Sequence, residues 1–215
     1  EVNNDSLRVK TLNEVEIEED LSQINQSYSS VNKPGEAIRQ ISGADFIRRG
    51  NYAYEPVFRG LTMERMNITL DGMRIFGACT DKMDPVTSYV STNNLSGIAA
   101  SQSQNSSAFG GTSPVGLNLA TKKARFTGEP QFTGTGLYGL SFNGLGNVAQ
   151  GSVDYSSSKF GLRVSGSYRD ADPYNDGNGN EVLYTQFHKL NLAANAKYRI
   201  SSNEWKFCTL HSQPG

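Results

Sequence analysis

The chain has few of the residues from which catalytic centres and disulfide-bonded cores are built. Its 215 residues include only two cysteines, which fit neither a disulfide-dense scaffold nor a four-ligand zinc site. No nucleophile stands with a base in a recognisable pattern, so the protein is not expected to be an enzyme. The 20 basic and 21 acidic residues give a net charge of -1, which excludes the broad basic surface that nucleic-acid binding requires.

Apolar residues are also scarce, at 36% of the chain, while glycine, serine, asparagine and threonine are abundant. This balance disfavours a helix bundle and favours a β-rich or loop-rich architecture. No apolar run reaches the roughly 18 residues that a transmembrane helix needs. Residues 85–121 contain no charged side chain. Such a polar run is typical of a disordered linker, although its scattered apolar residues fit equally well with backbone packed inside another structure.

The first 127 residues have a mixed pattern of short helices and strands. In "PGEAIRQISGADFIRRG" the apolar residues Ile38 and Ile41 lie on one helical face, and glycines follow them. "NITLDGMRIF" alternates apolar and polar residues about Asp71 and Gly72, a turn dipeptide, and therefore predicts a hairpin.

After Phe126 the pattern changes to a period of two. In "KFGLRVSGSYR" one face is apolar, while the other carries Arg163 and Arg169. "VLYTQFHKLNLAANAKYRI", residues 182–200, continues the alternation with a few exceptions, among them Phe187 on the polar face. Strands of soluble proteins are usually about 5 or 6 residues long. A run of this length therefore predicts a strand of a transmembrane barrel.

Two further features favour a barrel in the outer membrane. Tyr184 and Tyr198 share the apolar face, and at a tilt of about 40° they would lie roughly 35 Å apart along the barrel axis, near the spacing of two aromatic girdles. Tight turns in "DYSSSKF" and "RISSNEW" alternate with the long polar loop "RDADPYNDGNGNEV". Short turns on one side and long loops on the other are typical of such barrels. The alternative is a soluble β-sandwich with long strands.

Three segments resemble TonB-dependent outer-membrane receptors. "VFRGLTMERMNITLDGMRI" (57–75) is similar to the family's Arg-Gly followed by an apolar strand and Asp-Gly. "FGGTSPVGLNLATKKARF" (109–126) is similar to the segment that closes the plug and leads into the first barrel strand. "LNEVEI" is similar to the TonB box, an extended peptide that adds as a strand to the energy-coupling protein TonB. The TonB-box candidates are Leu12, Asn13, Glu14, Val15, Glu16 and Ile17.

The resemblance implies an α+β plug domain followed by antiparallel transmembrane β-barrel strands. The expected parts are an N-terminal arm with the TonB box (1–20), the plug (21–127) and the first strands of the barrel (128–215). Because family barrels have about 22 strands, this chain would hold an incomplete, truncated barrel of four strands and the start of a fifth. Its tail, "EWKFCTLHSQPG", loses the alternation expected of a fifth strand.

The resemblance also implies a location and partners. The protein is expected in the cell outer membrane, with the plug facing the periplasm and the barrel in contact with lipid. The expected protein partners are TonB and a surface lipoprotein.

"DGMRIFGACTDKMDPVTSYV" (71–90) resembles the subgroup of these receptors associated with copper uptake. In that subgroup a Cys and a Met from this part of the plug bind copper, and the matching residues here are Cys79 and Met83. A thiolate and a thioether are soft ligands that select Cu(I) over Mg, Ca or Mn. Their i, i+4 spacing brings both side chains to one side of a helical turn. The subgroup completes the site with a His and a Met from the barrel wall, which would lie beyond residue 215.

Several alternatives remain open for these residues and for the function. Cys79 is alternatively a buried free thiol, or the disulfide partner of Cys208. Asp84 is expected to cap or solvate the loop. The alternative functions are a receptor of the same family for a siderophore, cobalamin or glycan, and a non-transporting outer-membrane binding protein. Met83 alternatively fills the core, which is the role expected of Met63, Met66 and Met73.

Overall fold

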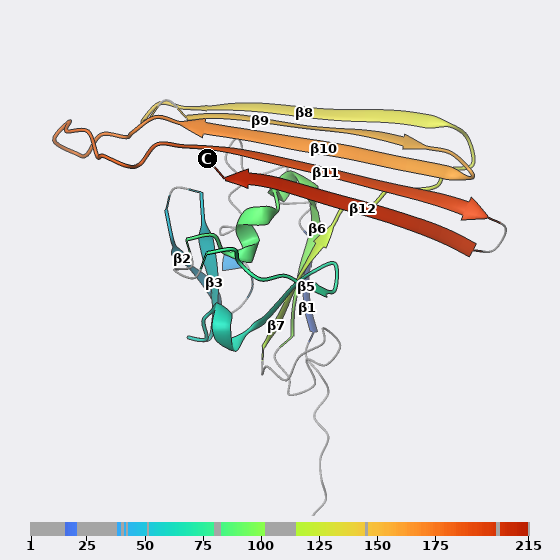
Figure 1. Cartoon of the computed structure of the whole chain (residues 1–215), viewed down its shortest axis with the longest axis horizontal. Helices are drawn as coiled ribbons and strands as arrows, with labels where there is room; N and C mark the ends of the chain where they lie inside the picture. The colour runs from blue at the N-terminus through green and yellow to red at the C-terminus, as the bar shows by residue number, and fades with distance from the viewer. Residues whose placement is uncertain are drawn as a thin grey trace, which may run out of the picture.

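The chain folds into two β-rich parts, and a sheet of long strands lies across a smaller, more compact part (Figure 1). Among the described residues, no helix is long and apolar enough to cross a membrane. The structure is a computed structural model, and it describes residues 16–20, 38–39, 41, 43–50, 52–79, 83–101, 115–144, 146–200 and 203–214.

The first part is built on a five-stranded sheet with the order β1-β6-β7-β4-β5. In this sheet β4 and β7 are parallel and the other pairs are antiparallel. The turn between β4 and β5 has positive φ at Asp71 (53°) and Gly72 (79°), the conformation of tight two-residue hairpins, and this confirms the predicted hairpin. The strands are β1 (Glu16–Asp20), β4 (Asn67–Leu70), β5 (Met73–Arg74), β6 (Leu95–Ser101) and β7 (Gly116–Thr121).

A separate hairpin pairs β2 (Ala44–Arg48) with β3 (Tyr54–Phe58). Residues 44–48, which follow the predicted helical face and Gly43, pair with β3. Ile38 and Ile41 are buried, as their predicted helical face required. Within the described residues, helical structure is limited to residues 38–39 and three 3₁₀ turns: η1 (Met63–Arg65), η2 (Val86–Tyr89) and η3 (Thr92–Asn94).

One hydrophobic core fills this first part of the fold. Phe160 and Val164 of the long strands stay outside it and are partly exposed, so the two parts do not share a core. Each fully buried aliphatic side chain contributes roughly 1.5–3 kcal/mol. This separation confirms the expected fold of a plug followed by antiparallel strands. The buried residues of the core include Ile38, Ile41, Phe58, Ile68, Leu70, Leu95, Ile98, Leu117 and Leu119.

The second part is a sheet of five antiparallel strands in chain order. It is not closed in this chain, so β8 and β12 form its two edges. The domain boundaries expected at residues 20 and 127 stay predictions. The strands are β8 (Gln131–Ser141), β9 (Gly146–Ser156), β10 (Phe160–Ala171), β11 (Phe187–Ile200) and β12 (Asn203–Pro214).

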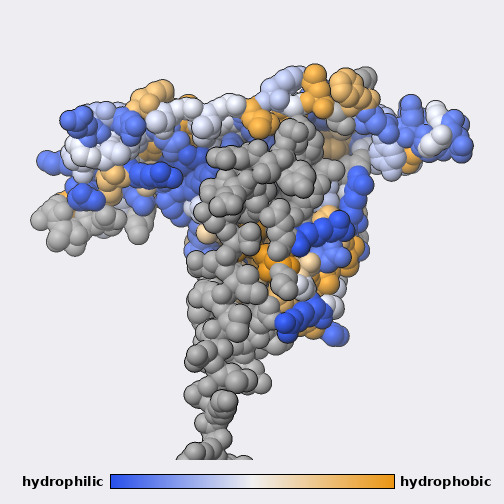
Figure 2. Space-filling view, turned by 180° about the vertical axis from the view of Figure 1, so that it is seen from behind, coloured by the Kyte–Doolittle hydropathy of each residue, from blue (hydrophilic) through white to orange (hydrophobic). Residues whose placement is uncertain are grey.

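The two faces of this sheet differ as the alternation predicted. Apolar side chains gather along its outer surface, at the top of Figure 2. On that face Phe160, Val164, Tyr168, Leu192 and Tyr198 are 36–47% exposed. On the inner face, which the plug covers, polar side chains are 4–9% exposed. They include Arg163, Ser165, Ser167, Lys189, Asn191 and Asn195. An apolar outer face is what a barrel wall presents to lipid.

One of the two predicted girdle tyrosines is placed differently. Tyr184 lies in the loop before β11, with φ at 63°, so it does not belong to the apolar face of a strand. Tyr168 on β10 is the outward aromatic residue toward that end of the sheet. It lies eight residues from Phe160, whose register partner is Tyr198. The outward aromatic residues therefore lie at two levels, roughly 20 Å apart along the barrel axis. This distance is close to the height of the apolar band of a membrane barrel.

The C-terminal tail forms a complete fifth strand, which the sequence did not predict. Trp205 and Phe207 of β12 are exposed and pair in register with Tyr198 and Ala196 of β11. The residues that point to the outer face have even numbers on β11 and odd numbers on β12. The alternation therefore continues with a shifted parity at Trp205 and Phe207 but not at Thr209 and His211, and the edge of β11 provides the backbone partners of the strand.

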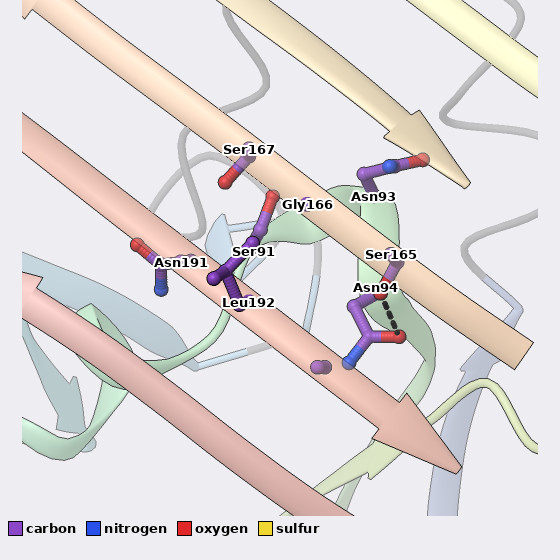
Figure 3. A pocket seen from close by; sticks show the side chains of 9 residues that line it. Ser91, Asn93, Asn94, Ser165, Gly166, Ser167, Asn191 and Leu192 are labelled. Carbon is purple, nitrogen blue, oxygen red and sulfur yellow. Dashed lines mark hydrogen bonds between the residues drawn. The ribbon is translucent and has the colours of Figure 1, made fainter. Parts of the chain in front are cut away.

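Several contacts attach the plug to the inner face of the barrel sheet. Past the end of β7, the backbone N–H of Ala124 donates to Oδ1 of Asn195 at 2.8 Å. The guanidinium of Arg199 lies 4.2 Å from the centre of the Phe126 ring. In η3, Oδ1 of Asn94 accepts from the Ser165 hydroxyl at 3.1 Å (Figure 3).

Asp71 ties the β4–β5 turn to the end of β7, and we expect its removal to loosen that edge. Its carboxylate accepts from the Thr121 backbone N–H at 2.9 Å and from the Thr121 hydroxyl at 2.7 Å, and it pairs with Lys123. Asp71→Ala leaves these donors without their acceptor, at a cost of roughly 1–3 kcal/mol. Hydrogen exchange at Thr121 in the full-length protein should become about tenfold faster or more.

The control for this prediction is Asp45→Ala. Asp45 also carries a carboxylate paired with a cation, Arg39, but both side chains are exposed. Its removal should leave the exchange of Thr121 unchanged. If the two variants gave equal exchange rates at Thr121, Asp71 would have no specific structural role.

Candidate functional site

The candidate site is the loop between β5 and η2, which carries Cys79 and Met83. The loop is closed where the backbones of Gly77 and Asp84 meet. A Cβ atom at Gly77 would lie 2.6 Å from the Asp84 carbonyl oxygen, so no larger residue fits there without displacement. This approach brings together the two ends of the segment that carries both sulfur atoms. The expected helical turn at residues 80–82 lies outside the described residues.

The turn η2 holds the loop from one side. The Tyr89 hydroxyl accepts from the backbone N–H of Ala78 at 2.8 Å. The Asp84 carboxylate accepts from the Ser88 hydroxyl. Burial raises the pKa of Tyr89, and its hydrogen bond to Asp84 raises it further. Tyr89 therefore keeps its proton and links the start of the loop to the end.

Both candidate ligands are accessible to a ligand. Cys79 is half-buried and carries a free thiol, so the structure does not have the alternative disulfide with Cys208. Met83 is 60% exposed and does not fill the core. Met73 is 59% exposed, so its expected role as core filler is wrong, whereas Met66 is buried as expected. That the two sulfur atoms point into one shared space stays a prediction.

Tyr52, a plug residue between β2 and β3, lies near this loop and also contacts the barrel wall. Burial raises the pKa of Tyr52, and the negative charges of Asp84 and of ionised Cys79 raise it further. The Tyr52 ring lies 5.5 Å from the ring of Phe187, centre to centre, and 4.6 Å from Nζ of Lys189. The exceptional position of Phe187 on the polar face of its strand is thus explained by contact with the plug.

Sequence reasoning found the two sulfur residues but missed Tyr52, Tyr89 and Lys189. The break in alternation at Phe187 was the one signal in the sequence that pointed to this contact. Tyr52 and Lys189 come from segments far apart in the chain, and no spacing rule connects them with Cys79.

The donor set suits a soft ion. Across the described part of the chain, no three His, Cys, Asp or Glu residues lie close enough together to hold a metal ion. Clusters of three carboxylates, which many Ca²⁺ sites contain, are therefore not found among those residues. A thiol and an exposed thioether remain, and these match Cu(I) in softness.

The TonB-box candidates fall partly outside the described residues. Leu12, Asn13, Glu14 and Val15 are not described, whereas Glu16 and Ile17 begin β1 and pair with Ser101 and Ala100 of β6. The expectation that this segment is a strand only against TonB is wrong for Glu16 and Ile17. The edge of β6 already offers them unpaired backbone groups.

Comparisons with known proteins agree with this architecture. Residues 20–117 match the family model described as TonB-dependent Receptor Plug Domain. The fold is similar to a structure described as "Copper transporter OprC", with a TM-score of 0.76 and 22% identity over 93% of this chain and 30% of that one. The curated proteins contain no match.

Receptors for other cargo are also similar. The siderophore receptor PirA from Pseudomonas aeruginosa matches with a TM-score of 0.64 and 17% identity, over 93% of this chain and 35% of that one. The Serratia marcescens hemophore receptor HasR, in complex with its hemophore HasA and heme, matches with a TM-score of 0.66 and 17% identity, over 93% and 31%. The chain thus spans about a third of the length of these structures.

The fold defines the class at the level of architecture: a plug followed by antiparallel strands in an unclosed sheet, similar to the fold of TonB-dependent receptors. Within that architecture, residues 20–117 are the part that matches the model of the TonB-dependent receptor plug domain.

The closed loop makes Gly77 a test of the geometry around Cys79. Gly77→Ala forces a Cβ against the Asp84 carbonyl, and overpacking of this kind costs roughly 1–3 kcal/mol. The loop should open more often, and the Cys79 thiol should react with a thiol reagent about five to 100 times faster. The rate is measured in the full-length protein with Cys208→Ser as background.

Gly128→Ala is the matched control, because open space surrounds its Cβ position. It should leave the reaction rate of Cys79 unchanged. An unchanged rate in Gly77→Ala as well would show that the loop is not held closed by this contact.

Proposed function

We propose that the protein is a TonB-dependent outer-membrane receptor that imports copper, with Cys79 and Met83 as plug-side ligands. The observation that carries the proposal is the accessible thiol and thioether in one loop, whose ends are held together at Gly77 and Asp84. The similarity to a structure described as a copper transporter supports it. Proteins of this family are transporters, so no catalytic step is assigned.

The chemistry of the two ligands explains the choice of cargo. Cys79 binds as a thiolate, which neutralises one charge of the ion, and Met83 adds a neutral sulfur. Hard ions prefer oxygen and gain little from either group. The remaining ligands, a His and a Met of the barrel wall, are expected beyond residue 215. Ligands divided between plug and wall separate when the plug moves, and this provides a route for release of the ion.

The energy for that movement is proposed to come from TonB. The proposed contact with TonB includes the start of β1, which lies at the edge of the plug sheet. The outer face of the barrel strands would contact membrane lipid, with the plug toward the periplasm. A surface lipoprotein remains a proposed partner.

A receptor for a siderophore or heme is the second candidate function. The similar folds of PirA and HasR favour it. Cobalamin or glycan uptake and a non-transporting binding role belong to the same group of alternatives, because none of them needs the Cys79 thiol.

Copper binding separates these candidates. In the full-length protein Cys79→Ser should lower copper affinity by more than the roughly 10–100-fold that follows from loss of an outer hydrogen-bond partner of a ligand. Met83→Leu keeps the side-chain volume, so it should weaken binding without unfolding the plug. Affinity should also fall with pH, because thiolate ligation releases a proton. The measurements are copper stoichiometry and affinity.

Met73→Leu is the control for the thioether, since Met73 is as exposed as Met83 but lies outside the loop. It should bind copper like the wild type. Equal copper content in the wild type and Cys79→Ser would refute copper ligation by this loop and favour another cargo.

The TonB box is tested by cross-linking. Single cysteines at positions 12–17, in a background without Cys79 and Cys208, should form disulfides with cysteines placed in TonB, because the box adds to TonB as a strand. Alternate positions should react most strongly, since side chains of a strand alternate in direction. A cysteine at Asp45, on an exposed plug hairpin, should form none. Absence of every cross-link in cells that import the cargo would contradict the assignment.

A further inference from the structure

A small cavity separates the plug from strands β10 and β11. Its volume of about 10 Å³ leaves room for roughly one water-sized particle. The plug contributes Ser88 and Ser91, and the wall contributes Ser167, Arg169, Lys189 and Asn191. A second cavity of similar size adjoins it, because both are lined by Ser91, Ser167 and Asn191 (Figure 3).

Lys189 is the unusual residue of this cavity. It is 4% exposed, and within the described residues its Nζ has no hydrogen-bond partner and no ion pair. Its contact with the Tyr52 ring is a partial substitute. Buried ammonium groups are normally paired, because removal of a charge from water is costly.

A second cation stands directly opposite Lys189. Arg169 of β10 is its register partner, and both side chains line the cavity. Like charges at directly opposite positions of a sheet destabilise it. Among the described residues, no carboxylate lines the cavity. Asp84 acts on Lys189 electrostatically, but beyond the distance of an ion pair, and it already accepts from Ser88.

We propose that this cavity binds one small monatomic anion, with chloride as the physiological ligand. The ammonium of Lys189 and the guanidinium of Arg169 supply the positive charge, and the hydroxyl of Ser91 supplies a donor from the plug. Water fills the same volume but leaves the charge of the Lys189 ammonium uncompensated. Phosphate and sulfate are too large for the space. The anion joins the barrel wall to Ser91, the residue before η3, so it holds the plug in place independently of the cargo.

Bromide replaces chloride and is visible by anomalous scattering. Crystals of the full-length protein in bromide should show an anomalous peak between Lys189 and Arg169. Lys189→Met should remove the peak, and Lys189→Gln, which keeps donors without the charge, gives the same test if the methionine variant does not fold. Lys197→Met changes a half-buried lysine on the same face of β11 and should keep the peak. No peak in the wild type, or a peak that persists without the Lys189 charge, overturns the proposal.

Hydrogen exchange tests binding in solution. Exchange of residues 86–94 in the wild type and in Lys197→Met should be severalfold slower in sodium chloride than in sodium gluconate of equal ionic strength. In Lys189→Met, or in Lys189→Gln, the two salts should give equal rates. A bromide peak without this difference in the wild type would mean an adventitious ion only, and would overturn the proposal. An equal difference in wild type and Lys189 variants would do the same.

Discussion

The contact between a polar plug surface and the polar inner face of the barrel strands is the constraint on which the rest of the structure depends. Serine, asparagine, lysine and arginine side chains of β10 and β11 are buried because η2 and η3 cover them. Buried polar groups require partners, and the plug supplies them at Asn94 and Ala124. The uncharged composition of residues 86–94, which include η2 and η3, fits this contact, since a neutral polar surface gains hydrogen bonds without burying further charge.

The same contact places the candidate metal loop. Gly77 and Asp84 close the loop, Tyr89 of η2 holds its start, and Tyr52 connects it to Phe187 and Lys189 of the wall. Cys79 and Met83 therefore lie on a plug segment close to Tyr52, which contacts the barrel strands. Lys189 and Arg169, the two cations beside this loop, lie in the same contact between the plug and the barrel strands. A movement of the plug would therefore change both the charge and the packing around them.

Period-two alternation predicted the barrel strands well because it depends on local geometry: successive side chains of a strand point to opposite faces. It failed at Tyr184, because this residue lies in the loop before β11. It also failed around Trp205, because the outward residues change there from even to odd numbers.

The sequence by itself determined the division into a plug and alternating strands, the hairpin at Asp71 and Gly72, and the presence of a thiol and a thioether four residues apart. Each of these follows from near neighbours in the chain. Only the tertiary structure decided that Met83 is exposed, that Asp84 closes on Gly77, and that Lys189 faces Arg169 in a cavity beneath the plug. These features arise between segments separated by many residues, where packing and strand register decide which side chains meet.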